Sequence, residues 1–103
     1  MREKGVFVTT NELVSDLRQL KHELHDRFGI EQIALFGSYA RNEADSKSDV
    51  DIAIVKMAKK DLFKRLQAKT FLETKLNKKV DIGYFDSMKT FIRNRIKEDL
   101  IYV

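Results

Sequence analysis

Apolar residues recur at spacings of three and four positions in three segments of the chain, which is the pattern of helices with one buried face. The first predicted helix follows Thr10, which suits an N-cap, and ends at Gly29, which suits a C-terminal stop. A second predicted helix covers residues 60–76 and ends in a turn at Asn77, and a third follows Ser87 as its cap. The positions predicted to be buried are Leu13, Leu17, Leu20, Leu24 and Phe28 in the first helix, Leu62, Phe63, Leu66, Phe71, Leu72 and Leu76 in the second, and Met88, Ile92, Ile96 and Leu100 in the third.

Short apolar runs between these helices predict strands at residues 30–36, 49–56 and 80–85. Because successive side chains of a strand alternate between faces, the second run has an apolar face and a face that carries carboxylates. The apolar face consists of Val50, Ile52 and Ile54, and the other face consists of Asp49, Asp51, Ala53 and Val55. With a short helical turn at 38–42 and a polar loop at 43–48, the order α-β-α-β-α-β-α predicts an α/β (α+β) fold, a sheet covered by helices.

Length and composition indicate one small domain. The chain has 103 residues, 43% of them hydrophobic, so we expect a single domain over residues 1–103 with residues 1–9 as a loose arm. Its net charge of +4 suits an anionic ligand without requiring one. The lack of cysteine excludes disulfides and thiolate metal sites. No apolar run has the form of a signal peptide or a membrane span, and we therefore expect a cytoplasmic protein with no membrane partner.

Three aspartates are the candidate catalytic and metal-binding residues. Asp49 and Asp51 lie on the same face of a predicted strand, so their carboxylates repel one another unless a cation lies between them. Such oxygen ligands suit Mg²⁺, which takes its other ligands from phosphates and water. Asp81 alternates with apolar neighbours in the next predicted strand, and there it can join the same face, hold a metal ion and accept a proton from an attacking hydroxyl. One or two Mg²⁺ ions at these acids would suit a displacement at phosphorus.

Gly37, Ser38 and Arg41 are the candidate nucleotide-binding residues. A glycine at a strand end lets the backbone approach a phosphate, and the N–H groups of the following turn and the Ser38 hydroxyl can hydrogen-bond that phosphate. Arg41 follows one helical turn later and can reach the same anion. The chain has neither the P-loop pattern nor the Gly-x-Gly-x-x-Gly pattern, so the predicted phosphate site depends on a metal ion and a short Gly-Ser turn.

The arrangement of these motifs resembles the DNA polymerase β-like nucleotidyltransferase superfamily. Gly37-Ser38 is followed, after ten residues, by Asp49-Val50-Asp51, and Asp81 lies in a later predicted strand. The run Gly-Ser-Tyr-Ala-Arg, together with Ser-Asp-Val-Asp-Ile, is similar to the minimal, MNT-type branch, and the resemblance covers about residues 10–102. One departure is Asn42, where that branch usually carries a glycine after the arginine.

The resemblance implies a three-stranded mixed sheet of order 1-2-3 with helices packed on one side. It implies transfer of a nucleoside monophosphate from an NTP, with ATP expected, to a hydroxyl, with release of pyrophosphate. Asp49 and Asp51 would hold Mg²⁺, Asp81 would complete the triad, and Ser38 would grip the triphosphate. Proteins of this branch are commonly antitoxins paired with a HEPN ribonuclease toxin, and some silence it by adenylylating a tyrosine.

Two alternatives to that role stay open. The chain could be a binding module that masks a toxin by contact alone, for which exposed apolar residues are expected at Ile101, Tyr102 and Val103. It could also be a transferase for a small-molecule or RNA acceptor that borrows a second subunit for specificity. Direct nucleic-acid binding is not expected, and both homo-oligomers and hetero-oligomers are compatible with the sequence.

Overall fold

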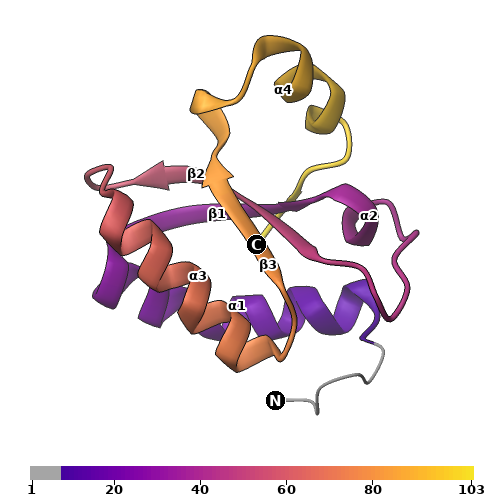
Figure 1. The fold of residues 1–103 in the computed structure, drawn as a ribbon, viewed down its shortest axis with the longest axis horizontal. Helices are drawn as coiled ribbons and strands as arrows, with labels where there is room; N and C mark the ends of the chain where they lie inside the picture. Colours follow the sequence, from indigo (N-terminus) through magenta and orange to yellow (C-terminus); the bar gives the residue numbers. More distant parts are fainter. Residues whose placement is uncertain (1–7) are drawn as a thin grey trace.

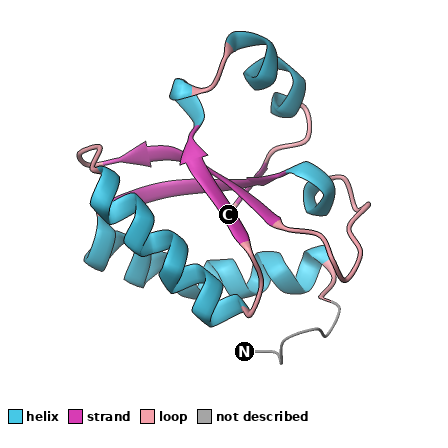
Figure 2. Ribbon diagram, viewed as in Figure 1, coloured by secondary structure: helices cyan, strands magenta, loops and turns pink. Residues whose placement is uncertain are grey.

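The computed structural model describes residues 8–103, which form one mixed sheet flanked by helices (Figures 1 and 2). The predicted alternation of helices and strands is confirmed, with one further strand at the C-terminal end. The elements in chain order are α1 (Thr10–Phe28), β1 (Ile30–Phe36), α2 (Gly37–Ala40), β2 (Val50–Met57), α3 (Leu62–Leu76), β3 (Val80–Tyr84), the 3₁₀ turn η1 (Phe85–Ser87), α4 (Thr90–Lys97) and β4 (Ile101–Tyr102).

Helix α1 begins with a capping box rather than at the predicted cap, Thr10. The Thr9 hydroxyl accepts the backbone N–H of Glu12, and the Glu12 carboxylate accepts the backbone N–H of Thr9, both at 3.1 Å. Val8 is buried in the core, so the predicted loose arm is wrong at residues 8 and 9; its other positions, 1–7, lie outside the described residues. Gly29 ends the helix as predicted, with a left-handed φ of +69°.

The sheet has the order β3-β2-β1-β4, which contains the predicted order 1-2-3 and adds β4 beside β1. Strand β1 is antiparallel to β2 and to β4, whereas β2 and β3 are parallel and are joined by the α3 crossover. Exposure was predicted for Ile101, Tyr102 and Val103, and only Tyr102 is exposed. Strand β4 brings Val103 into the core, and the Val103 N–H donates to the Ile33 carbonyl at 3.2 Å.

The long helices α1 and α3 lie together on one side of the strands, and α4 lies beyond the other side (Figure 1). The predicted apolar face of β2 is buried, with Val50 and Ile52 fully inaccessible and Ile54 2% exposed. Because side chains alternate along β2, Asp51 points to the side away from this core. The arrangement therefore leaves the carboxylates of β2 and β3 on the face that α1 and α3 do not cover.

The predicted buried face of α3 is wrong at its N-terminal end. Leu62, Phe63 and Leu66 are 55%, 77% and 47% exposed, while the helix buries Ala68, Phe71, Leu72 and Leu76. At about 100° per residue, Phe63 and Leu66 lie roughly opposite Ala68 and Leu72 around the helix axis. The apolar residues of α3 thus form a buried stripe and a separate, solvent-facing one.

The last predicted helix is shorter than expected. Ser87 does not cap it, because residues 85–87 form the 3₁₀ turn and α4 begins after Lys89 without a side-chain cap. Ile96 is the residue that α4 buries, and Leu100 lies beyond the helix end. None of the described helices is long and apolar enough to cross a membrane.

Candidate functional site

Strands β2 and β3 bring two of the predicted acids together. In their parallel register Asp51 lies beside Asp81, and Val50 and Ile52 lie beside Val80 and Ile82. Laterally paired residues of a sheet project to the same face, so the two carboxylates share the face that α1 and α3 leave uncovered. Asp49 comes one residue before β2 begins, where the pattern had placed it inside the strand. Asp51 is half-buried, whereas Asp49 and Asp81 are exposed.

These three acids form one electrostatic group centred on Asp51. Burial is the largest cause that raises the pKa of Asp51, and the negative charges of Asp81 and Asp49 raise it further, against a smaller lowering by Arg41. A divalent cation would relieve that repulsion, and an all-carboxylate donor set fits Mg²⁺. Within residues 8–103, no three Asp, Glu, His or Cys side chains are already gathered tightly enough to enclose a metal ion. The metal-binding roles of Asp49, Asp51 and Asp81 stay predictions.

Position 37 requires a glycine for two reasons: its backbone conformation and its closeness to Asp51. Its φ is +76°, which L side chains rarely adopt. A Cβ added at this position would overlap the Asp51 carboxylate, with the Asp51 Cγ only 3.0 Å away. The sequence predicted that this glycine makes room for a phosphate. The structure shows that it also makes room for the Asp51 carboxylate, because Phe36, the residue before it, pairs with Asp51. The phosphate-binding role of Gly37 stays a prediction.

Ser38 lies in α2, directly after Gly37, and is partly buried. The Ser38 carbonyl accepts the Glu43 N–H at 2.8 Å, which ties α2 to the loop that leads toward β2. Asn42 takes the left-handed conformation, with a φ of +59°, which asparagine tolerates better than most residues. The chain therefore turns at Asn42 despite the missing glycine. The phosphate-binding role of Ser38 stays a prediction.

Arg41 is already paired. Its Nε donates to Glu43 Oε1 at 2.8 Å, and this hydrogen bond is the main cause that raises the pKa of Arg41, with smaller raising effects from the charges of Glu43, Asp99 and Asp51. The guanidinium is thus near the acidic group, and the bond to Glu43 engages its Nε while the Nη donors are the ones that would bind a phosphate. This pairing could not be predicted, because Glu43 lies in the segment predicted to be a polar loop.

Two residues of α3 hold the strand that carries Asp81, and neither was singled out from the sequence. Glu73 Oε2 accepts the Val80 N–H at 3.1 Å, and Arg65 Nη1 donates to the Ile82 carbonyl at 3.1 Å. These contacts lie on either side of Asp81, on the edge of β3 that no strand covers. They fix the backbone of Asp81 against β2.

The loop before Asp49 is held by its own hydrogen bonds. The Asp45 N–H donates to the Ser48 hydroxyl at 2.9 Å, and the Lys47 N–H donates to Asp45 Oδ1 at 2.8 Å. The Ser48 N–H donates to the Asp45 carbonyl at 3.1 Å. This closed turn sets the point at which the chain enters β2 and so positions Asp49.

Comparisons with known proteins relate this chain to others of the same fold. The family model of the nucleotidyltransferase domain matches residues 17–103. A protein adenylyltransferase of Thermococcus cleftensis is 36% identical over 97 residues, which are 94% of this chain and 98% of that protein. A solved structure of a minimal nucleotidyltransferase has a TM-score of 0.74 at 26% identity, over 91% of this chain and 95% of that one. A chain in the complex of a tri-AMPylated Shewanella oneidensis HEPN toxin with an MNT antitoxin has a TM-score of 0.59 at 22% identity, over 90% and 66% of the two chains, and this likeness shows the fold alone.

Proposed function

This chain belongs to the nucleotidyltransferase domain family and is a nucleotidyltransferase, and on that premise we propose that it transfers AMP from ATP to a hydroxyl group of a partner protein. The observation that carries the proposal is the acidic group, in which Asp51 lies beside Asp81 in register and carries a pKa raised by burial and by its acidic neighbours. The identity to a protein adenylyltransferase across almost the whole of both chains supports AMP as the transferred group.

The reaction needs one bond made and one bond broken at the α-phosphorus of ATP. The acceptor oxygen bonds to that phosphorus, the bond to the bridging oxygen breaks, and pyrophosphate leaves. In this proposal Asp81 accepts the proton of the acceptor hydroxyl, and Gly37, Ser38 and Arg41 bind the departing phosphates. Asp49 and Asp51, with Asp81, would hold Mg²⁺. When bound, that ion would neutralise phosphate charge and stabilise the charge that develops in the displacement.

The proposed acceptor is a tyrosine of a HEPN-type toxin, and the chain would then act as its antitoxin in the cytoplasm. Support comes from the fold shared with the chain from the AMPylated HEPN toxin complex.

The test is transfer of label from α-labelled ATP, in the presence of Mg²⁺, to a purified HEPN-type toxin. We expect wild type to label the partner and Asp49→Ala/Asp51→Ala to label it at background level. Asp86→Ala is the matched control, because Asp86 is an exposed aspartate paired with Lys60 at 3.0 Å and lies outside the acidic group. Equal labelling by wild type and the double variant would contradict the proposal.

A second candidate function is masking by contact alone, which is favoured by the large apolar side chains left exposed on α3. In that case Asp49→Ala/Asp51→Ala would neutralise the toxin as well as wild type does. Growth rescue by the double variant, measured beside labelling by wild type, separates the two functions. Labelling of a small molecule or an RNA, but not of the protein, would point to the remaining alternative.

A further inference from the structure

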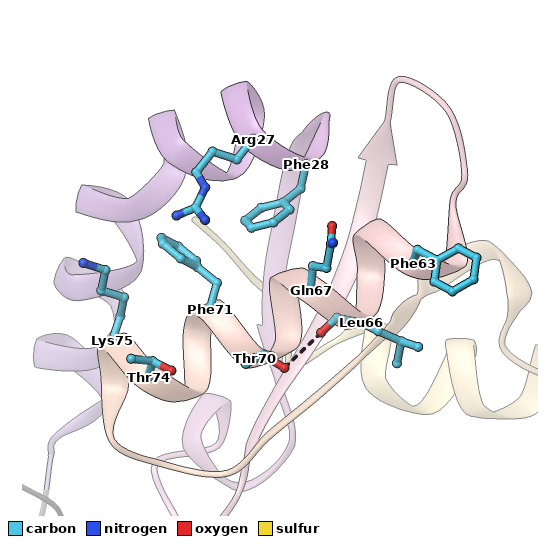
Figure 3. Close-up of a pocket in the computed structure, with 9 residues that line it drawn as sticks. All are labelled: Arg27, Phe28, Phe63, Leu66, Gln67, Thr70, Phe71, Thr74 and Lys75. Atoms are coloured by element: carbon cyan, nitrogen blue, oxygen red, sulfur yellow. Dashed lines mark hydrogen bonds between the residues drawn. The ribbon is translucent and has the colours of Figure 1, made fainter.

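An apolar groove runs between the C-terminal end of α1 and the outer side of α3, away from the acidic group. Figure 3 shows Arg27 and Phe28 of α1 facing Phe71 of α3, with Phe63 and Leu66 further along α3 and pointing away from α1. The groove has a volume of about 780 Å³, within the usual range for ligand-binding clefts. Phe63 is 77% and Leu66 is 47% exposed, so both are available to a partner.

The groove has a positive rim. The Arg27 guanidinium lies 4.9 Å from the centre of the Phe71 ring, and the Lys75 ammonium lies 5.8 Å from the same centre. Within residues 8–103, Arg27 also forms a long ion pair with Glu23, at 3.7 Å. Of the described residues that line the groove, none is acidic. Its shape and charge therefore suit a segment that presents apolar side chains flanked by carboxylates.

A second copy of this chain does not have that chemistry. Symmetric pairing through the groove would bring Arg27 and Lys75 of both copies into one interface, to which the described groove residues contribute no acidic side chain. Among the exposed apolar side chains outside the groove, Phe91 and Ile92 lie on α4 beside Arg93 and Arg95, so a head-to-tail contact between the groove and α4 would also join positive surfaces. Charge thus favours a different, acidic protein.

We propose that the groove docks an acidic amphipathic helix of the partner protein, with Phe63 and Leu66 as the apolar anchors and Lys75 as a charged contact. Two neighbouring helices form a groove that suits a third helix, whose apolar face would enter it. This inference rests on the proposed function for the identity of the partner. Since the groove lies on the side of the sheet opposite Asp51 and Asp81, a docked partner leaves the acidic group open, and binding and transfer become separable.

The test measures both events with a purified HEPN-type toxin. Calorimetry gives the affinity, and transfer of labelled AMP is measured at saturating partner. We expect Phe63→Ser/Leu66→Ser to weaken binding by about tenfold to a hundredfold, because it removes two apolar side chains that the complex would bury. Phe91→Ser is the matched control, because Phe91 is 67% exposed on α4 and is expected to leave the affinity unchanged. Lys75→Glu should weaken binding and remove part of its salt dependence, whereas Lys97→Glu on α4 should do neither.

The outcomes distinguish the docking surface from the proposed reaction. Groove-dependent binding without any labelling by wild type would reject the transfer reaction and keep the docking surface. Labelling with an affinity that Phe63→Ser/Leu66→Ser leaves unchanged would reject the docking surface and keep the reaction. A wild-type dimer in sedimentation velocity that this double variant dissociates would also overturn the inference, because the occupant would then be a second copy of the chain.

Discussion

Replacing Gly37 with alanine tests whether the close approach between residue 37 and Asp51 shapes the site. The substitution makes two changes, since alanine must adopt a φ of +76° and its Cβ must displace the Asp51 carboxylate. The left-handed conformation costs an L-residue about 1–2 kcal/mol. Forcing an extra carbon into an occupied space costs about 1–3 kcal/mol more. We therefore expect Gly37→Ala to lower the free energy of unfolding by about 2–5 kcal/mol.

Two other glycines separate these contributions. Gly29 also has a positive φ, +69°, but the nearest atom to an added Cβ is the Ala58 Cβ at an ordinary 3.8 Å, so Gly29→Ala carries the conformational cost alone. An added Cβ at Gly83 would have no atom within 4 Å, so Gly83→Ala carries neither cost. It should be neutral or stabilise by about 0.4–1 kcal/mol through the entropy of the unfolded chain.

The assay is urea unfolding of the three variants, followed by AMP transfer under conditions in which each is folded. We expect the loss of stability to fall in the order Gly37→Ala, Gly29→Ala, Gly83→Ala, and transfer to be lost only in Gly37→Ala, because only there is Asp51 displaced. Equal destabilisation by Gly37→Ala and Gly29→Ala would show that the contact with Asp51 carries no energy. Wild-type transfer by a folded Gly37→Ala would show that the position of Asp51 does not matter to the reaction.

Three further substitutions follow from the structure. Asp51→Asn should raise the free energy of unfolding in EDTA at pH 7 by about 0.2–1 kcal/mol, since it removes a partly buried charge that also lies beside Asp81. Because burial and, to a lesser degree, Asp81 and Asp49 raise the pKa of Asp51 on folding, the gain should shrink as the pH falls through that pKa, and a pH-independent gain would contradict this cause. Glu73→Ala should destabilise by about 1–3 kcal/mol by leaving the Val80 N–H without its acceptor, whereas Glu73→Gln, which keeps an oxygen there, should cost less than half as much in the same urea experiment. Thr9→Ala should cost about 0.5–2 kcal/mol through the loss of the capping box, and a cost near zero in thermal unfolding would refute the N-cap assignment.

The elements that the sequence predicted are those whose signals are local. Helix α1 has a regular apolar stripe and a glycine at its end, and residues 30–36 form β1 as expected. Strand β4 could not be predicted in this way, because two residues are too few to show a period and their conformation depends on the free edge of β1. Helix α3 carries two apolar stripes, and only its packing against α1 and the sheet decides which of them is buried.

In the candidate site, too, the features with local signals were predictable and the contacts between separate elements were not. The motif spacing identified the family correctly, and alternation along the strands placed Asp51 and Asp81 on one face, as the register confirms. The contacts that hold these residues could not be read from the sequence, because they join separate elements. Glu73 and Arg65 reach β3 from α3, and the reason for a glycine at position 37 becomes clear only when β1 and β2 are paired.

The side chains of α3 that hold β3 also decide how this sheet can meet other chains. An open strand edge invites pairing with a foreign strand, which leads to aggregation or to recognition by strand addition. On the β3 edge, Glu73 and Arg65 occupy the N–H of Val80 and the carbonyl of Ile82, and on the opposite edge β4 is only two residues long. At the β3 edge a further strand would therefore find two of its bonding groups already taken, and a partner that meets this edge has to be recognised through side chains rather than through backbone hydrogen bonds.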